Sequence, residues 1–218
     1  MIQPQIHFLG DGALLCNLPP PATLAHQQRI WSLAELAASW PEISEVVPGM
    51  NNLTLILQRP VRDMDAVSQR VLDSWPHIDI GHLTGRDIDI PVVYGGVGGP
   101  DLDVIARHTG LSAEEVIRRH SEGKYIVYFI GFMPGFAYMG GLDPQLATPR
   151  QAEPRLSIPA GSVGIGGEQT GIYPLTSPGG WQLLGRTALP LFQPMQNPPT
   201  LLRPGDRVRF IVERIEKC

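Results

Sequence analysis

The first 86 residues switch between strand-like and helix-like spacing of apolar positions. Short apolar-rich runs between turn residues predict four strands, at 5–9, 13–16, 45–47 and 53–57. Apolar residues at helical intervals predict two helices, the first capped by Thr23 and the second opened by Asp63. Two strand-rich units, each with one helix, indicate a small α/β sandwich of the split βαβ type in residues 1–86.

A polar segment with two glycines at 77–86 is typical of a linker, so a second domain is expected at 87–218. It opens with an alternating run, Asp87–Tyr94, that predicts a strand. Two short helices should follow it. Their boundaries are set by an N-cap, a terminating glycine and a capping box, at Asp101, Gly110 and Ser112/Glu115.

From Tyr125 onward the chain has short β-rich segments and dense turn residues, but no long helical period. Between Arg155 and Arg186 the only charged residue is Glu168, while glycine and proline are frequent. Apolar residues recur between these breakers, which favours a packed β-barrel over disorder.

The uncharged stretch 125–142 is long enough to be tested as a membrane span. It contains Pro134 and four glycines, which interrupt a helix, and its 18 residues fall at the short end of the length required. No basic segment precedes Arg29, and the two cysteines do not form a disulfide framework. We therefore expect a cytoplasmic protein without a membrane segment.

Charge narrows the classes of partner. The chain has 17 basic and 21 acidic residues, and its arginines are scattered, which is a poor footprint for nucleic acid. The predicted helix pair has the offsets of a DNA-binding helix-turn-helix, at Ala106, Gly110 and Val116. Acidic residues open its second helix, however, so we favour a plain helical hairpin and expect no nucleic-acid binding.

The glycine-rich run 161–167 could form an anion cradle, because glycines expose backbone N–H groups. It lacks the Gly-Lys-Ser/Thr of a P-loop, and Gln169 stands where a dinucleotide fingerprint needs its last glycine. Tight β-turns are the alternative reading of Gly164, Gly166 and Gly167. Ala160 also breaks the nucleophile-elbow pattern around Ser162.

The sequence contains no strong metal-binding motif. His77, Asp79 and His82 are loosely spaced like ligands, but they lie in the predicted linker, so a solvated segment is favoured and no metal site is expected.

Polar and aromatic residues gather in the nearly uncharged region. Arg150 and Arg155 are separated by four residues and could form a fork for a carboxylate or phosphate. Further candidates that could line the same pocket are Gln169, Thr170, Tyr173, Trp181 and Arg186. Arginines on barrel rims with aromatics in the core are the alternative. His120 is a weak candidate for a general base, weighed against a structural role at a helix end.

Several blocks of this sequence resemble the KipI-like, allophanate-hydrolase-subunit-1-like family. They are Ile90–Gly96, Gly99–Leu102, Gly131–Tyr138, Pro149–Arg155, Pro159–Gly167, Gln169–Pro174, Ser177–Trp181, Gly185–Thr187 and Leu202–Val208, together with Pro48–Asn52. The resemblance covers nearly the whole chain.

The resemblance implies an α+β protein with a ferredoxin-like N-terminal domain and a cyclophilin-like barrel of the carboxyltransferase type. It also implies one component of a heteromeric, ATP-dependent 5-oxoprolinase, in which the chain would be the B subunit and would act with the C and A subunits on a small cyclic amide. ATP, with magnesium, would bind at a site shared with the partner or lying on it. An inhibitor of a sensor histidine kinase and an accessory component of allophanate or urea hydrolysis are the family's other possibilities.

Overall fold

A computed structural model describes residues 2–58, 63–80 and 85–217. The chain divides into two compact units, Met1–Leu83 and Thr84–Cys218, which are described separately. The linker expected at 77–86 falls partly outside the described residues, as does His82 of the weak metal motif.

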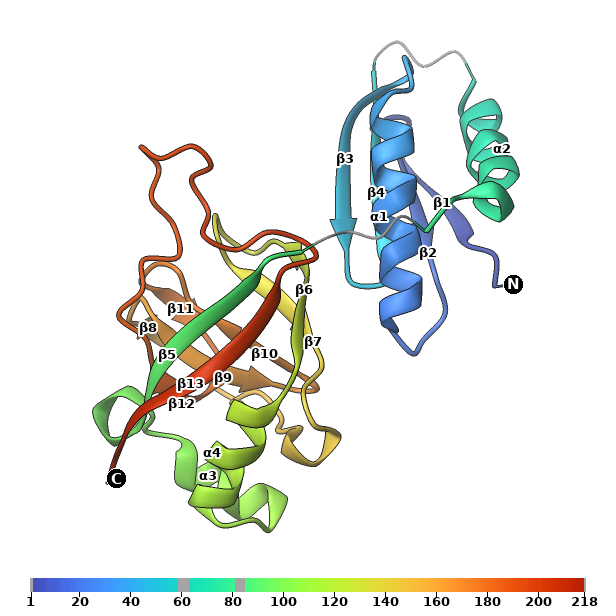
Figure 1. The fold of residues 1–218 in the computed structure, drawn as a ribbon. Coiled ribbons are helices and arrows are strands. Elements are labelled where there is room, and N and C mark those ends of the chain that lie inside the picture. Colours follow the sequence, from blue (N-terminus) through green and yellow to red (C-terminus); the bar gives the residue numbers. More distant parts are fainter. Residues whose placement is uncertain (1, 59–62, 81–84, 218) are drawn as a thin grey trace. The chain divides into compact units, whose positions relative to one another are not determined.

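The first unit contains a four-stranded antiparallel sheet with two helices (Figure 1). The strands are β1 (Gln5–Leu9), β2 (Ala13–Asn17), β3 (Ile43–Gly49) and β4 (Asn52–Leu57), in the order β1-β2-β4-β3. The helices are α1 (Leu24–Ala38) and α2 (Met64–Ser74). Strand β4 therefore lies between β2 and β3, which α1 connects.

The helix starts of this unit agree with the caps predicted from sequence. Thr23 accepts a hydrogen bond from the backbone of His26, and Asp63 accepts one from Ala66. Both helices and alternate residues of β2 and β4 bury their apolar side chains in one core, which includes Leu14, Ile30, Leu53, Val71 and Trp75.

The second unit is a closed barrel of seven strands in the order β10-β7-β6-β13-β5-β12-β9. Their bounds are β5 (Asp87–Gly95), β6 (Tyr125–Ile130), β7 (Ala137–Gly140), β9 (Ser162–Gly166), β10 (Gln169–Ile172), β12 (Gln182–Arg186) and β13 (Arg207–Glu216). A separate ribbon pairs β8 (Arg155–Ile158) with β11 (Ser177–Gly179). The first and last strands, β5 and β13, pair in parallel and lie side by side (Figure 1).

The uncharged stretch 125–142 thus forms the β6–β7 hairpin. No helix of the described residues is long and apolar enough to cross a membrane. Short 3-10 helices occupy Trp75–His77, Gly96–Gly98 and Pro144–Leu146.

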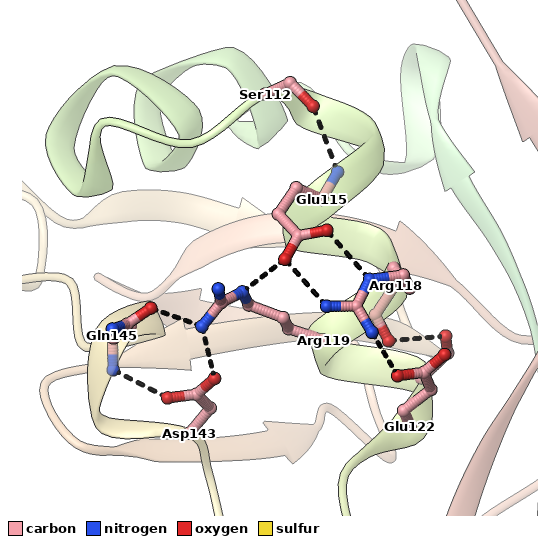
Figure 2. A network of polar contacts seen from close by, with 8 residues as sticks. Ser112, Glu115, Arg118, Arg119, Glu122, Asp143 and Gln145 are labelled. Atoms are coloured by element: carbon pink, nitrogen blue, oxygen red, sulfur yellow. Dashed lines mark hydrogen bonds and ion pairs between the residues drawn. The ribbon is translucent and has the colours of Figure 1, made fainter.

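A helical hairpin, α3 (Leu102–Thr109) and α4 (Ala113–Glu122), connects β5 to β6. Gly110 ends α3 in the left-handed conformation, as predicted. At α4, Ser112 accepts from the Glu115 backbone, but the Glu115 carboxylate binds Arg118 and Arg119 instead of closing the capping box (Figure 2).

The arginines of this hairpin are engaged with acidic side chains. Arg118 also pairs with Glu122, and Arg119 also pairs with Asp143 (Figure 2). Bonds from both arginines lower the pKa of Glu115 to about 2. This pairing offsets the positive charge that phosphate contacts would need, and the absence of nucleic-acid binding stays a prediction.

Candidate functional site

An apolar cluster separate from the barrel interior contains two of the predicted site residues, Tyr173 and Trp181, and lies beside Arg150. It contains Phe136, Ile158, Tyr173, Trp181 and Leu183, all buried, with Tyr138 packed against them. The rings of Phe136, Tyr173 and Trp181 meet edge to face, with centroids 5.4 to 6.4 Å apart. Tyr173 and Trp181 are therefore part of a buried aromatic cluster, which agrees with the alternative of aromatics in the core, and their role as pocket walls stays a prediction.

Arg155 is fixed above this cluster by a buried carboxylate. Its Nη2 donates to Oδ1 of Asp101 over 2.6 Å. The Asp101 side chain is 7% exposed, and its Oδ2 accepts from the backbone N–H of Leu183 over 2.7 Å. The other terminal nitrogen of Arg155, Nη1, is buried and has no hydrogen-bond partner within the described residues.

Arg150 lies beside the same aromatic cluster, and its side chain is exposed. Its guanidinium carbon is 5.8 Å from the centre of the Trp181 ring, within the range of a cation–π contact. No hydrogen bond of this guanidinium is found within residues 2–58, 63–80 and 85–217. Backbone bonds from Gln151 to Gly180 and a side-chain bond from Gln182 to Pro149 fix the segment that carries it.

The positive charge of Arg150 acts on the neighbouring phenols. Burial raises the pKa of both Tyr138 and Tyr173, and the charge of Arg150 opposes that rise. The structure thus brings Arg150, Arg155, Tyr173 and Trp181 together. An arginine with an unpaired buried N–H, beside a second exposed arginine, suits an oxyanion of a carboxylate or phosphate.

Asp101 is the partner of Arg155 that sequence reasoning missed. We expected its side chain to cap α3, but it makes no capping bond and turns to Arg155 and Leu183 instead. Two residues more than 50 positions away cannot be recognised as partners from local spacing alone.

His120 and Thr170 lie in the barrel interior, away from the arginines. His120 is completely buried, and burial lowers its pKa to about 3, so it is neutral. Its Nδ1 is 2.8 Å from the Tyr94 hydroxyl, and its Nε2 is 2.9 Å from the Thr170 hydroxyl. This placement fits the structural role that was weighed against a catalytic one.

The predicted glycines serve packing and a turn. A Cβ on Gly166 would lie 2.4 Å from Nε1 of Trp181, and one on Gly164 would lie 3.3 Å from Cβ of Trp181. Gly167 adopts a positive φ of 65° between β9 and β10. Gln169 begins β10 and is half-buried. Gly167 thus fits the tight-turn alternative, whereas Gly164 and Gly166 lie within strand β9 and pack against Trp181.

Arg186 lies in a cavity whose lining includes neither Arg150 nor Arg155. The cavity has a volume of about 620 Å³ and is lined by β5, β9, β12 and β13 and by residues 187–192. Arg186 donates from Nε to the backbone oxygen of Ala160 over 3.0 Å. The structure therefore divides the predicted site residues among the aromatic cluster, the barrel interior and this cavity. No cluster of three or more metal-ligating side chains occurs among the described residues.

Comparison with known proteins gives close relatives over the full length. The chain is 51% identical over 219 residues to the B subunit of 5-oxoprolinase from Escherichia coli O157:H7, covering 100% of both chains. It is 50% identical over 208 residues to the B subunit of 5-oxoprolinase from Haemophilus influenzae, covering 95% of this chain and 97% of the relative.

Solved structures show the same fold inside longer chains. The protein TTHA0988 is 35% identical with a TM-score of 0.78, over 93% of this chain but only 40% of that one. Urea amidolyase from K. lactis, at 20% identity, matches in fold alone with a TM-score of 0.82, over 96% of this chain and 15% of that one. The family model "Carboxyltransferase domain, subdomain C and D" matches residues 4–202. The chain therefore belongs to the family of carboxyltransferase domain, subdomain C and D, proteins, together with the relatives named as the B subunit of 5-oxoprolinase.

Proposed function

We propose that this chain is the B subunit of a bacterial ATP-dependent 5-oxoprolinase, a complex that opens 5-oxo-L-proline to L-glutamate. The observation that carries the proposal is the identity of about one half, over the whole length, to two relatives with that name. We propose a cytoplasmic location for the complex.

The chemistry of the arginine–aromatic cluster is consistent with this reaction. A lactam carbonyl is a poor electrophile, and ATP supplies the phosphoryl group that turns its oxygen into a leaving group. Water can then attack the carbonyl carbon, and the ring C–N bond breaks as the nitrogen takes up a proton. This leaves an acyl phosphate, which a second water hydrolyses to glutamate and inorganic phosphate. Negative charge develops on oxygen at each stage, and preorganised N–H donors stabilise it most effectively in a site with little water.

In this proposal Arg155 offers its unpaired Nη1 to one such oxygen, either of the substrate carboxylate or of the phosphoryl group. The Asp101 carboxylate fixes the guanidinium plane, so that little reorganisation is needed when the anion binds. Arg150 adds a second positive charge, and its guanidinium contacts the buried cluster of Tyr173 and Trp181 through the Trp181 ring.

The partner proteins supply what this chain lacks. The sequence has no P-loop, and the described residues hold no cluster of metal ligands, so our proposal assigns the Mg²⁺ ligands and much of the ATP site to the C subunit. The A subunit assists ring opening.

The fold of each unit is also part of this proposal. We propose a ferredoxin-like domain at 1–86 and a cyclophilin-like barrel at 87–218. In the first unit, the order β1-β2-β4-β3 supports the assignment, because β1 takes the edge place that the last strand of a split βαβ repeat would fill.

The test compares the single chain with the reconstituted set of B, C and A subunits. Release of ADP and glutamate from ATP and 5-oxo-L-proline should require all of them, and the single chain should show none. Full turnover by the single chain, or no turnover by the complete set, would contradict the proposal. Urea serves as a second substrate, because a weaker match of 32% identity links half of this chain to a yeast urea amidolyase. Preference of the complex for urea would move the assignment to that alternative.

A further inference from the structure

On the side of the cavity formed by the barrel strands, polar side chains around Arg186 lie in one row across the sheet. Four residues on neighbouring strands pair in register across the sheet. Their order is Arg214 on β13, Val93 on β5, Arg186 on β12 and Ser162 on β9. Register partners project their side chains to the same face of a sheet. All four residues line the cavity, so one cross-strand row presents two guanidinium groups and a hydroxyl to it.

Two members of this row have donors to spare. Ser162 is 1% exposed and lines the cavity, and no hydrogen bond of its hydroxyl is found in the described part of the chain. Arg186 uses Nε for the Ala160 carbonyl, and its two terminal nitrogens make no bond within that same part. The Ser162 hydroxyl is not fully enclosed, and as a group that lines the cavity it can donate to a ligand or to water.

Arg214 is already neutralised. Its Nε and Nη2 both donate to Oε1 of Glu216, at 3.0 and 2.7 Å. Among the charged residues that line the cavity, this leaves one uncompensated positive charge, on Arg186. One guanidinium edge plus one hydroxyl matches the two oxygens of a monoanion better than a phosphate dianion.

Apolar side chains form much of the remaining wall, which also includes Thr187. They comprise Val97, Pro174, Leu189, Pro190 and Phe192. Glycine keeps the arginine accessible, since a Cβ on Gly98 would come within 3.0 Å of the Arg186 Cβ. A volume of about 620 Å³ is within the range of small-molecule sites, which combine apolar walls with a few polar groups.

From this arrangement we propose that the cavity binds a small monocarboxylate with an apolar body, whose carboxylate is held by Arg186 and Ser162. The site is distinct from the arginine–aromatic cluster, and the proposal does not rest on the function proposed above.

The test is calorimetric titration of the full chain with acetate, butyrate and 3-phenylpropionate, at constant ionic strength. Affinity should rise along this series as the apolar body grows. The uncharged 3-phenylpropionamide, matched in shape, should bind at least about tenfold more weakly, because it loses the charge-assisted bonds. Absence of binding by 3-phenylpropionate, equal binding of acid and amide, or tighter binding of inorganic phosphate would overturn the proposal.

Variants locate the ligand. Arg186→Gln should weaken 3-phenylpropionate binding about tenfold or more, and Ser162→Ala several-fold. The matched control is Arg209→Gln, since Arg209 is an exposed arginine of β13 that pairs with Asp89. Thermal melts establish that each variant is folded. If Ser162→Ala fails to fold, Arg186→Gln alone decides the test, because Arg186 is exposed and its substitution leaves the core unchanged. Unchanged binding in Arg186→Gln, or loss in Arg155→Lys instead, would refute the assigned site.

Discussion

Arg155 and Asp101 show how one buried ion pair can prepare a binding atom. The carboxylate is nearly enclosed and receives both a guanidinium N–H and a backbone N–H. Breaking such a pair leaves a buried charge without compensation, which costs more than the pair itself contributes. The consequence is a guanidinium held in one orientation, with Nη1 buried and without a hydrogen-bond partner in the described residues.

Substitution of Arg155 by Lys tests this role. Lysine keeps the charge beside Asp101 but loses the planar fork, so kcat/KM of the reconstituted complex should fall 10- to 100-fold, about 1.4 to 3 kcal/mol. Stability should change by less than about 1 kcal/mol, because the ion pair is kept. Arg209→Lys, at an exposed pair with Asp89, is the control. Early melting with unchanged activity per folded molecule would make Arg155 structural.

Asp101→Asn probes the same pair from the other side. The amide can still accept from Leu183 but no longer attracts the guanidinium, so Arg155 should lose its fixed orientation. We expect kcat to fall about tenfold or more with a smaller change in KM, since positioning acts mainly on the transition state. Kinetics of the reconstituted complex provide the measurement. A change in KM alone would argue against a positioning role.

At the scale of elements, strand β9 is adapted to Trp181. Gly166 leaves the space that the indole fills, and Gly164 lies against the Cβ of the same residue. The indole in turn contacts the Arg150 guanidinium. Close packing of this kind transmits a one-carbon change to the site, because the interior has few voids to absorb it.

Gly166→Ala should therefore destabilise the protein by about 1 to 3 kcal/mol, since its methyl group would overlap the Trp181 ring. Gly180→Ala is the matched control, because the added Cβ would meet only ordinary contacts at 3.6 Å or more. Denaturant unfolding of both variants measures the difference. Equal stability of the two would contradict the packing role of Gly166.

The link between α4 and the barrel depends on a neutral histidine. The Thr170 hydroxyl donates to the Gly164 carbonyl over 3.0 Å, so its oxygen accepts from Nε2–H of His120. Nδ1 then accepts from the Tyr94 hydroxyl. Tyr125 and Phe210 enclose the ring, and the Tyr125 hydroxyl donates to the His120 backbone oxygen. No charged side chain contacts the imidazole in the described residues to favour its protonation.

Stability should consequently fall as the pH is lowered from 7 to 5. The unfolded chain binds a proton near pH 6.5, whereas burial lowers the folded pKa of His120 to about 3. Protonation therefore stabilises the unfolded state by about 2 kcal/mol relative to the folded state between pH 7 and pH 5. The lowered pKa values of Glu115 and Asp143 matter only at more acidic pH. Urea unfolding at each pH measures the slope, which should be flatter in His120→Gln. Equal slopes in both proteins would contradict the neutral, buried imidazole.

At the scale of the whole molecule, features set by neighbouring residues could be predicted from the sequence, whereas contacts between distant segments could not. Caps at Thr23, Asp63 and Gly110 were predictable, because each depends on residues within one turn. The aromatic–arginine grouping was also predictable, since its members are concentrated in one uncharged region. Three features were not predictable, because they join residues distant in sequence. They are the Asp101–Arg155 pair, the placement of Arg186 in a cavity apart from the aromatic cluster, and the parallel pairing of β5 with β13.

Closure of the barrel by its first and last strands leads to a prediction about truncation. Strand β13 pairs with β5 along nine register pairs and with β6 at its start, and it places Val208 and Phe210 in the core. The unit also has a core of its own, separate from that of the first unit. A fragment of residues 85–218 should therefore unfold cooperatively, as judged by near-ultraviolet circular dichroism during a thermal melt. A fragment of residues 85–206 exposes the edges of β5 and β6 and should aggregate or lack fixed tertiary structure. Two equally cooperative fragments would show that the barrel does not need its last strand to fold.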